Sequence, residues 1–453
     1  MVTDFAGEGS KARVVQKETE GGEAGIRFES ATTSGRPWRR IWLRALRPRP
    51  RTTLWCVFRF NSLRVATYGF HRPPVLATAQ AMIPFNKPVQ LGSELTDIGR
   101  AFVGGQTAGC GPLGEACEAR LQAMVGCRAL LVSSCTHALE MAALLLEVGP
   151  EDEVIVPSFT FVSTANAFVL RGARPVFADV DENGNLDVGE VERLRTARTR
   201  AICVVHYAGN SCDMDALRVA ARGLPIIEDA AQALGAEFRG KPLGTLGFAG
   251  AISFHETKNV GCGEGGALLL PAGELAERAE YLREKGTNRR RFHEGLVDKY
   301  TWVDVGSSYV LSELNAAYLS PQLEAFAKIQ ERRHAVFRAY QQALKEPAER
   351  AGAALLGIPA GNTPNAHLFA LVFRNGKQRT DYIRHMRENG ILTPFHYVAL
   401  HLSPMGQRFH DGRPLPVSER LTDCLVRLPL FFNITNSEVD TVIGRTLEFL
   451  RGV

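Results

Sequence analysis

Three groups of side chains in the middle of the chain have the types and the order that one kind of cofactor chemistry needs. Asp229 follows the apolar pair Ile226-Ile227 and Glu228, and Lys258 follows the next apolar run, Ala249–Ser253. Upstream, Ser133-Ser134-Cys135-Thr136 opens a helical stretch, and hydroxyls and backbone N–H groups at a helix start form an anion site. A lysine can hold a pyridoxal ring as an imine, while an acid pairs with the ring nitrogen and a helix N-terminus holds the phosphate.

Each of these residues also has an ordinary interpretation. A lone lysine is usually solvated, and a carboxylate after a strand often caps a helix. The glycine-rich segment Gly261–Gly266 has the spacing of GxGxxG, but it precedes a strand, whereas that motif opens a helix in dinucleotide-binding proteins; the chain contains no Walker GxxxxGK[ST] and no HExxH. Nicotinamide, ATP and metal sites are therefore not expected. The order of acid, lysine and glycine segment is what favours pyridoxal chemistry.

These residues need a scaffold of alternating strands and helices. Strands are expected at Glu153–Pro157, Pro175–Ala178, Ala201–Val205, Pro225–Glu228, Ala249–Ser253 and Gly266–Leu270, with helical patterns between them such as Asp213–Arg222. Such alternation predicts an α/β fold with a mostly parallel sheet, which binds ligands beyond the carboxyl ends of its strands. A long helical stretch, Ser312–Leu344, is expected to break at Pro321 and to lead into a smaller domain.

Length and charge limit the remaining possibilities. A chain of 453 residues is expected to form two globular parts, with a large domain at 82–330 and a small C-terminal domain at 331–453. Residues 1–81 carry 14 Lys and Arg against six Asp and Glu, so the net charge of +5 leaves the rest slightly acidic. Nucleic-acid binding is therefore not expected, and no apolar run is long enough to span a membrane. Nine scattered cysteines without a CxxC pair are typical of a reduced, cytoplasmic protein.

The first 81 residues differ from the rest. They become Arg-rich from Arg36 to Arg72, show no sustained helical or strand period, and lack the apolar core of a secretory signal. A transit peptide is disfavoured by Glu18, Glu20 and Glu23. We expect a poorly ordered extension upstream of a globular sequence that opens at Met82, which is itself a candidate translation start.

From Met82 onward the chain resembles the DegT/StrS family of sugar aminotransferases. The resemblance is carried by four motifs: Pro157-Ser-Phe-Thr-Phe-Val-Ser-Thr164, Glu228-Asp-Ala-Ala-Gln232, Ser253-Phe-His-Glu-Thr-Lys-Asn259 and Gly263-Glu-Gly-Gly266. It implies the pyridoxal-phosphate-dependent transferase fold type I, similar to aspartate aminotransferase. Further runs, Arg283-Glu-Lys-Gly-Thr-Asn-Arg289 and Asp298-Lys-Tyr-Thr-Trp302 among them, are most similar to transaminases that make dTDP-4-amino-4,6-dideoxygalactose.

The resemblance implies a role for each matching residue. Lys258 would bind pyridoxal 5′-phosphate as an imine and move a proton, and Asp229 would pair with the pyridinium nitrogen. Gln232 would lie near the ring hydroxyl, and Phe161 would stack on the ring. The phosphate would be held by Ser253, Cys135 and Thr136. The implied reaction moves an amino group, with L-glutamate as the donor, to C4 of a nucleotide-linked 4-keto-6-deoxy sugar.

The resemblance is weaker at other positions. Family members supply Gly-x-Asn-x-Arg to the phosphate across a dimer interface, whereas this chain has Gly306-Ser-Ser-Tyr-Val310, so Ser308 is the nearest replacement. A homodimer or higher homo-oligomer is expected. His396, Arg289 and Tyr309 are candidate substrate residues, although His396 equally suits packing and Ala399 stands where proline is usual. Two alternatives stay open: the same chemistry on another keto sugar or position, and a sensor without enzymatic activity.

Overall fold

The computed structural model describes residues 5–7, 10–20, 23–32, 41–44 and 82–452, and the chain forms two units, 1–76 and 77–453. In the first unit, β1 (Phe5–Gly7), β2 (Ser10–Glu20), β3 (Glu23–Thr32) and β4 (Ile41–Arg44) form an antiparallel sheet in that order. Strands were not expected here. A register shift between Val14 and Gln16 interrupts the alternation by which a strand is recognised. Poor order was expected over the whole of residues 1–81, and of these residues 1–4, 8–9, 21–22, 33–40 and 45–81 lie outside the described residues.

The second unit is built on a seven-stranded sheet. Its order is β5-β13-β12-β9-β8-β6-β7, with β5 (Arg128–Val132), β6 (Glu153–Pro157), β7 (Arg174–Ala178), β8 (Thr199–Val205), β9 (Ile226–Asp229), β12 (Ala249–Ser253) and β13 (Gly266–Leu270). Only β13 runs antiparallel to its neighbours. Three predicted strands have the predicted bounds, and the others agree within two residues. The mostly parallel α/β sheet expected from the sequence is therefore present.

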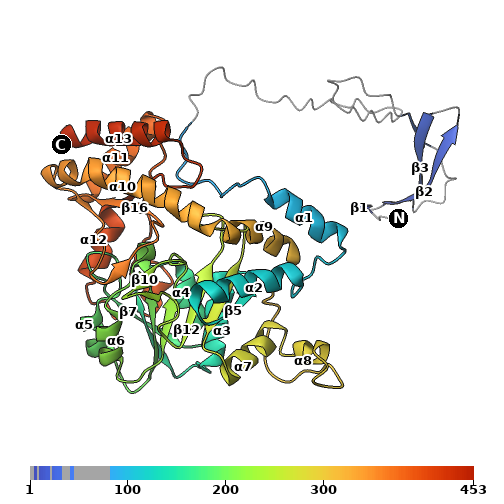
Figure 1. Cartoon of the computed structure of the whole chain (residues 1–453), viewed down its shortest axis with the longest axis horizontal. Coiled ribbons are helices and arrows are strands. Elements are labelled where there is room, and N and C mark those ends of the chain that lie inside the picture. The colour runs from blue at the N-terminus through green and yellow to red at the C-terminus, as the bar shows by residue number, and fades with distance from the viewer. Residues whose placement is uncertain (1–4, 8–9, 21–22, 33–40, 45–81, 453) are drawn as a thin grey trace. The chain divides into compact units, whose positions relative to one another are not determined.

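Helices cover both faces of this sheet, as Figure 1 shows. Successive strand residues point to opposite faces, so Leu131 and Ile155 join one buried cluster and Leu130 and Val154 the other. The first face is covered by α2 (Pro112–Val125), α5 (Val188–Leu194), α6 (Met214–Ala221) and α9 (Glu313–Glu324). The second face is covered by α3 (Cys135–Leu145), α4 (Val162–Val169) and α7 (Glu274–Arg283). Further helices are α1 (Glu94–Val103) and α8 (Arg289–His293).

The long helical stretch is divided, but not where it was expected. Pro321 lies inside α9, and the break falls at Ala325, before α10 (Phe326–Arg350) begins. A proline removes one backbone donor and crowds the carbonyl four residues earlier, which can kink a helix without ending it. Ala325 N donates to Pro321 O, which closes α9 one turn after the proline.

The C-terminal part has its own sheet and core. Its elements are β14 (Ala354–Leu355), β16 (Phe369–Val372), β17 (Leu425–Leu428), α11 (Gly376–Glu388), α12 (Pro416–Cys424) and α13 (Asn436–Arg451). A small sheet of β10 (Glu237–Phe238), β11 (Lys241–Pro242) and β15 (Asn362–Thr363) joins it to the larger part. Helix α10 contributes Ile329 to the large core and Val336 to the small one, so it belongs to both, and the predicted domain boundary at residues 330–331 stays a prediction. Ile83, however, pairs with Ile391, so the chain around residue 83 packs with the C-terminal part. No helix in the described residues is long and apolar enough to cross a membrane.

Candidate active site

A cavity of about 440 Å³ lies beyond the carboxyl ends of β8, β9 and β12, beside the start of α3. This is the edge of a parallel sheet at which ligands bind, and the volume suits a small-molecule site. Residues predicted from the sequence gather here: Cys135, Thr136, Phe161, Asp229, Gln232, Ser253, Lys258 and His396 all line the cavity. The sheet thus brings together side chains that are separated by up to 261 positions in the chain.

Lys258 lies in the loop after β12, where its backbone N–H donates to His255 O at 2.9 Å. Its side chain lines the cavity, and no described residue hydrogen-bonds to its amine. Burial lowers the pKa of Lys258 because the charged form loses solvation, while the nearby Cys135 and Asp229 oppose this shift. A lysine with a lowered pKa and a free amine is suited to nucleophilic and proton-transfer chemistry.

Asp229 is the last residue of β9 and is almost fully buried. Its Oδ2 accepts a hydrogen bond of 2.7 Å from Thr164 Oγ1, and its Oδ1 accepts from Ala231 N at 3.2 Å. Burial raises the pKa of Asp229, whereas these two bonds and the charge of Lys258 pull it down. The carboxylate is therefore held in place and ready to pair with a buried cation.

The start of α3 offers unused donors to the same cavity. Ser134 caps the helix by accepting from His137 N, which leaves the N–H groups of Cys135 and Thr136 without an acceptor in the helix. The first residue of β13, Gly266, lies directly against the start of α3. Only a glycine fits there, because a Cβ would stand 2.4 Å from Cys135 N. The hydroxyls of Thr136 and Ser253 complete a set of donors suited to a phosphate.

Another part of the cavity wall is formed by aromatic rings and by the amide of Gln232. Gln232 accepts from Ala208 N at 2.8 Å and donates to Tyr397 OH at 2.9 Å. His396 stacks on Tyr397 with ring centroids 3.7 Å apart, and its Nδ1 is 2.7 Å from Tyr207 OH. Burial holds the pKa of His396 well below its usual range, so its ring is neutral near pH 7. Phe161 remains 56% exposed, with its ring free at the cavity wall.

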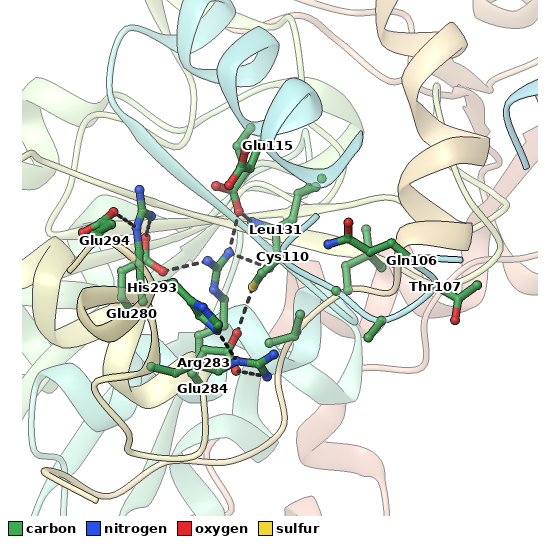
Figure 2. A pocket seen from close by; sticks show the side chains of 18 of the residues that line it. Gln106, Thr107, Cys110, Glu115, Leu131, Glu280, Arg283, Glu284, His293 and Glu294 are labelled. Carbon is green, nitrogen blue, oxygen red and sulfur yellow. Dashed lines mark hydrogen bonds and ion pairs between the residues drawn. The ribbon is translucent and has the colours of Figure 1, made fainter. Parts of the chain in front are cut away.

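Three predicted residues do not line this cavity in the single chain. Ser308 is exposed beside Glu284, and the Tyr309 hydroxyl points to Glu140 at 3.4 Å. Arg289 lines a separate cavity of about 820 Å³, shown in Figure 2. The role predicted for Ser308 belongs to a neighbouring subunit's site, so it stays a prediction, as do those of Arg289 and Tyr309.

The larger cavity in Figure 2 has a lining of ion pairs. Arg283 is buried between Glu118 and Glu280, with its Nη2 2.7 Å from Glu280 Oε2. Arg128 also pairs with Glu280, at 2.6 Å, and the thiol of Cys110 contacts Glu284 Oε1 at 2.9 Å. Most of the charged side chains around the larger cavity are therefore engaged in ion pairs with one another, whereas the amine of Lys258 is not.

Sequence reasoning missed three residues of the Lys258 site: Thr164, Tyr397 and Arg427. Thr164 and Tyr397 lie inside segments that were already noted, three residues after Phe161 and one residue after His396. Arg427 had a clear signal, because it is the one charged residue in the apolar run Leu425–Leu430. Arginine is rarely buried unless it has a partner, so an arginine in the middle of a buried strand indicates a binding role.

The groups around the smaller cavity fit pyridoxal 5′-phosphate. The unpaired amides at the start of α3 and the hydroxyls beside them suit its phosphate, a buried carboxylate suits its ring nitrogen, and an unpaired amine suits its carbonyl carbon. No group in this set would repel it.

Comparison with known proteins gives the same result. The model of the DegT/DnrJ/EryC1/StrS aminotransferase family matches residues 92–446. The aminotransferase TlmJ from Streptoalloteichus hindustanus is 32% identical, with a TM-score of 0.75 over 82% of this chain and 100% of that one. DesV from S. venezuelae is 33% identical, with a TM-score of 0.74 and the same coverage. The PLP-form of Spr1654 from Streptococcus pneumoniae, at 23% identity and a TM-score of 0.74 over 82% and 99% of the two chains, shares the fold.

Proposed function

The chain belongs to the DegT/DnrJ/EryC1/StrS aminotransferase family, whose members have fold type I and depend on pyridoxal 5′-phosphate, and we propose that it aminates a nucleotide-linked keto sugar. The observation that carries this proposal is the meeting of Lys258, Asp229 and the free N-terminus of α3 in one cavity. The acceptor is a dTDP-4-keto-6-deoxy sugar, the donor is L-glutamate, and the product is dTDP-4-amino-4,6-dideoxygalactose.

The residues of the cavity have distinct tasks in such a reaction. The bound cofactor supplies a conjugated ring that can take up the electrons of a deprotonated carbon. Cys135, Thr136 and Ser253 would hold its phosphate, and Asp229 would pair with its ring nitrogen. Gln232, held by Ala208 and Tyr397, presents a fixed amide at the cavity wall, and Phe161 offers an aromatic face.

Lys258 performs the proton transfer. Its amine accepts a proton from the carbon of the donor that bears nitrogen, and later returns a proton to the corresponding carbon of the sugar. The lowered pKa of Lys258 favours the neutral amine that this step needs. Because the amine makes no competing hydrogen bond, it is free to move between cofactor and substrate.

The choice of sugar rests on sequence similarity alone. The runs Arg283–Arg289 and Asp298–Trp302, together with Gly306-Ser-Ser-Tyr309, are most similar to transaminases that make dTDP-4-amino-4,6-dideoxygalactose. In this proposal Arg289 meets the diphosphate, because a guanidinium matches phosphate geometry.

The same region supports assembly into a homodimer or higher homo-oligomer. Between residues 296 and 305 the chain exposes Leu296, Tyr300, Trp302, Val303 and Val305, with Trp302 78% exposed. Such a group of apolar side chains is typical of an interface. We propose that a second copy covers it and that Ser308 reaches the phosphate of the neighbouring site.

One experiment tests the function directly. Purified protein with pyridoxal 5′-phosphate and L-glutamate is offered a panel of nucleotide keto sugars, and the amino-sugar product is identified by NMR. Lys258→Ala should lose both turnover and the cofactor's visible absorbance band, whereas Lys345→Ala, at an exposed site on α10, should keep both. Wild-type-like activity of Lys258→Ala would end the proposal.

A further inference from the structure

A second, much smaller cavity adjoins Lys258. Its volume is about 10 Å³, which is close to the space that one water molecule needs. Lys258 and Ser253 line both this cavity and the cavity of about 440 Å³. The side chains of Asn259, Asn365 and His367 line only the smaller one. The lysine therefore stands between the space for the cofactor and a small polar space.

The hydrogen bonds around His367 fix which of its ring nitrogens carries the proton. The side-chain nitrogen of Asn259 donates to Asn365 O at 2.9 Å and to Gln330 Oε1 at 3.2 Å, so the oxygen of this amide points the other way. That oxygen lies 2.9 Å from His367 Nδ1. An amide oxygen can only accept, so Nδ1 must be the donor. In a neutral ring Nε2 is then left as an acceptor.

The surroundings of His367 keep its ring neutral. Burial holds the pKa of His367 well below its usual range, and the charges of Lys258, Arg333 and Arg427 act in the same direction. The acceptor character of Nε2 is therefore retained near pH 7.

The backbone that carries His367 is held in a strained conformation. Ala366 has a φ of 50°, in the left-handed region that a residue with a side chain seldom adopts. Arg333 of α10 donates to Ala366 O at 3.1 Å and to His367 O at 2.6 Å, and the Asn365 side chain donates to Gln232 O at 2.9 Å. Such strain persists only where several contacts enforce it, and it is concentrated at functional sites. These contacts fix the position of the His367 ring beside the smaller cavity.

We infer that His367 is a positioning residue for Lys258, and that one water in the smaller cavity accepts from the lysine amine and donates to His367 Nε2. An amine with its N–H directed into the smaller cavity presents its lone pair to the larger one. A neutral acceptor suits this task, because a carboxylate in its place would favour the ammonium form. The inference rests on the role proposed for Lys258, and not on the identity of the sugar.

The first test reads the ring of His367 directly. In protein labelled with ¹⁵N-histidine and loaded with pyridoxamine 5′-phosphate, the lysine amine is free and the histidine tautomers are distinguished by NMR. The His367 signals are those missing from the spectrum of His367→Gln. We expect Nδ1 to be protonated and Nε2 to be unprotonated, with no titration near the usual histidine pKa of about 6.5.

The second test measures how well the amine is aimed, and it does not depend on turnover. At a pH where the amine is neutral in every variant, His367→Phe should slow the capture of pyridoxal 5′-phosphate by apo-protein roughly 10- to 100-fold. His367→Gln should lose less, because its amide oxygen can still accept. His334→Phe, at a partly buried position on α10 that lines neither cavity, is the matched control and should capture at the wild-type rate.

Pyridoxamine 5′-phosphate separates positioning from a structural role. It has no aldehyde, so its affinity does not need attack by the amine and should be unchanged in His367→Phe. Equal losses of capture and of pyridoxamine 5′-phosphate binding would overturn the inference and assign His367 a structural role. An Nε2–H tautomer in wild type, or wild-type capture by His367→Phe, would overturn it as well.

Failure of the proposed function has a different result. If no keto sugar is aminated while capture still depends on His367, the proposed function fails alone. If sugars are aminated and capture ignores His367, only the inference is lost. If Lys258→Ala captures the cofactor as wild type does, both are wrong.

Discussion

Thr164 Oγ1 donates a hydrogen bond of 2.7 Å to Asp229 Oδ2, and so joins the first helix turn after Phe161 to the end of β9. Thr160 lies 2.8 Å further along the same chain of hydroxyls. The carboxylate that should pair with the cofactor ring is therefore oriented by the motif that also contains Phe161, the aromatic predicted to stack on that ring. Two sequence motifs separated by about 65 residues act as one unit.

Thr164→Val tests this unit with little change in shape. The variant loses a hydrogen bond that favours the ionised carboxylate, so the pKa of Asp229 should rise further. A hydrogen bond to a charged group contributes about 1.5–3 kcal/mol, so we expect cofactor affinity to fall about 10- to 100-fold. Titration of apo-protein with pyridoxal 5′-phosphate measures this. Thr441→Val, at an exposed position on α13, should change nothing.

Asp229→Asn should stabilise the apo-protein near pH 7 and yet lower its activity. Burial raises the pKa of Asp229 in the folded apo-protein above the ordinary 3.8 of the unfolded chain. Folding then favours the protonated acid, and the charged form destabilises the fold increasingly as pH rises through the folded pKa. The neutral variant should melt higher than wild-type apo-protein near pH 7, with a difference that shrinks toward pH 4.

In activity the same variant should lose on the order of 10²- to 10³-fold, because a neutral amide stabilises a ring cation poorly. Melting curves of both apo-proteins across pH, together with turnover, give the two readouts. A variant that is less stable than wild type at neutral pH would show that burial does not dominate the pKa of Asp229.

The strands and the reactive residues were predictable for the same reason. Lys258 and Asp229 follow short apolar runs, and a parallel sheet brings the ends of such runs together whatever their distance in sequence. Arg427 was not found in this way, since it lies within a strand and reaches the cavity only through packing of the C-terminal part. The break at Ala325 was misplaced because a proline inside a helix does not always end it.

Glu228 was expected only as part of a motif, yet in the structure it is a buried acceptor that joins β9 to His206 and to the loop at Gly244. Glu228 and His206 are both fully buried, with Oε2 2.7 Å from Nε2, and Glu228 also accepts from Gly244 N at 2.8 Å. Removing one partner of a buried pair leaves the other unsatisfied. Glu228→Ala should lower the free energy of unfolding by about 3–5 kcal/mol in chemical denaturation.

The control for this prediction is Glu331→Ala, at an exposed position on α10, which should stay within about 0.5 kcal/mol of wild type. A loss in Glu228→Ala no larger than this would show that the surrounding loop relaxes to hydrate the histidine. Since His206 N also donates to Asp229 O at 3.0 Å, weaker cofactor binding should accompany the loss of stability.

The pH dependence of cofactor capture should report the charges around Lys258. Burial lowers the pKa of Lys258 from its ordinary 10.5, and only the neutral amine attacks a carbonyl. The rate at which apo-protein takes up pyridoxal 5′-phosphate should therefore rise with pH and level off at a lower pH than for an ordinary lysine, as followed by stopped-flow absorbance. Two neighbours act on this pKa with opposite sign, since Asp229 raises it and Arg427 lowers it.

Charge-removing variants should then move the midpoint in opposite directions. Arg427→Met removes a cation that disfavours the ammonium form, so the midpoint should shift upward; Asp229→Asn removes an anion that favours it, so the midpoint should shift downward. Lys345→Ala should leave it in place. A structural disturbance of the loop after β12 would move both variants the same way, so that result would refute the electrostatic explanation. Opposite shifts would fix Lys258, Asp229 and Arg427 as one coupled set of charges at the same cavity.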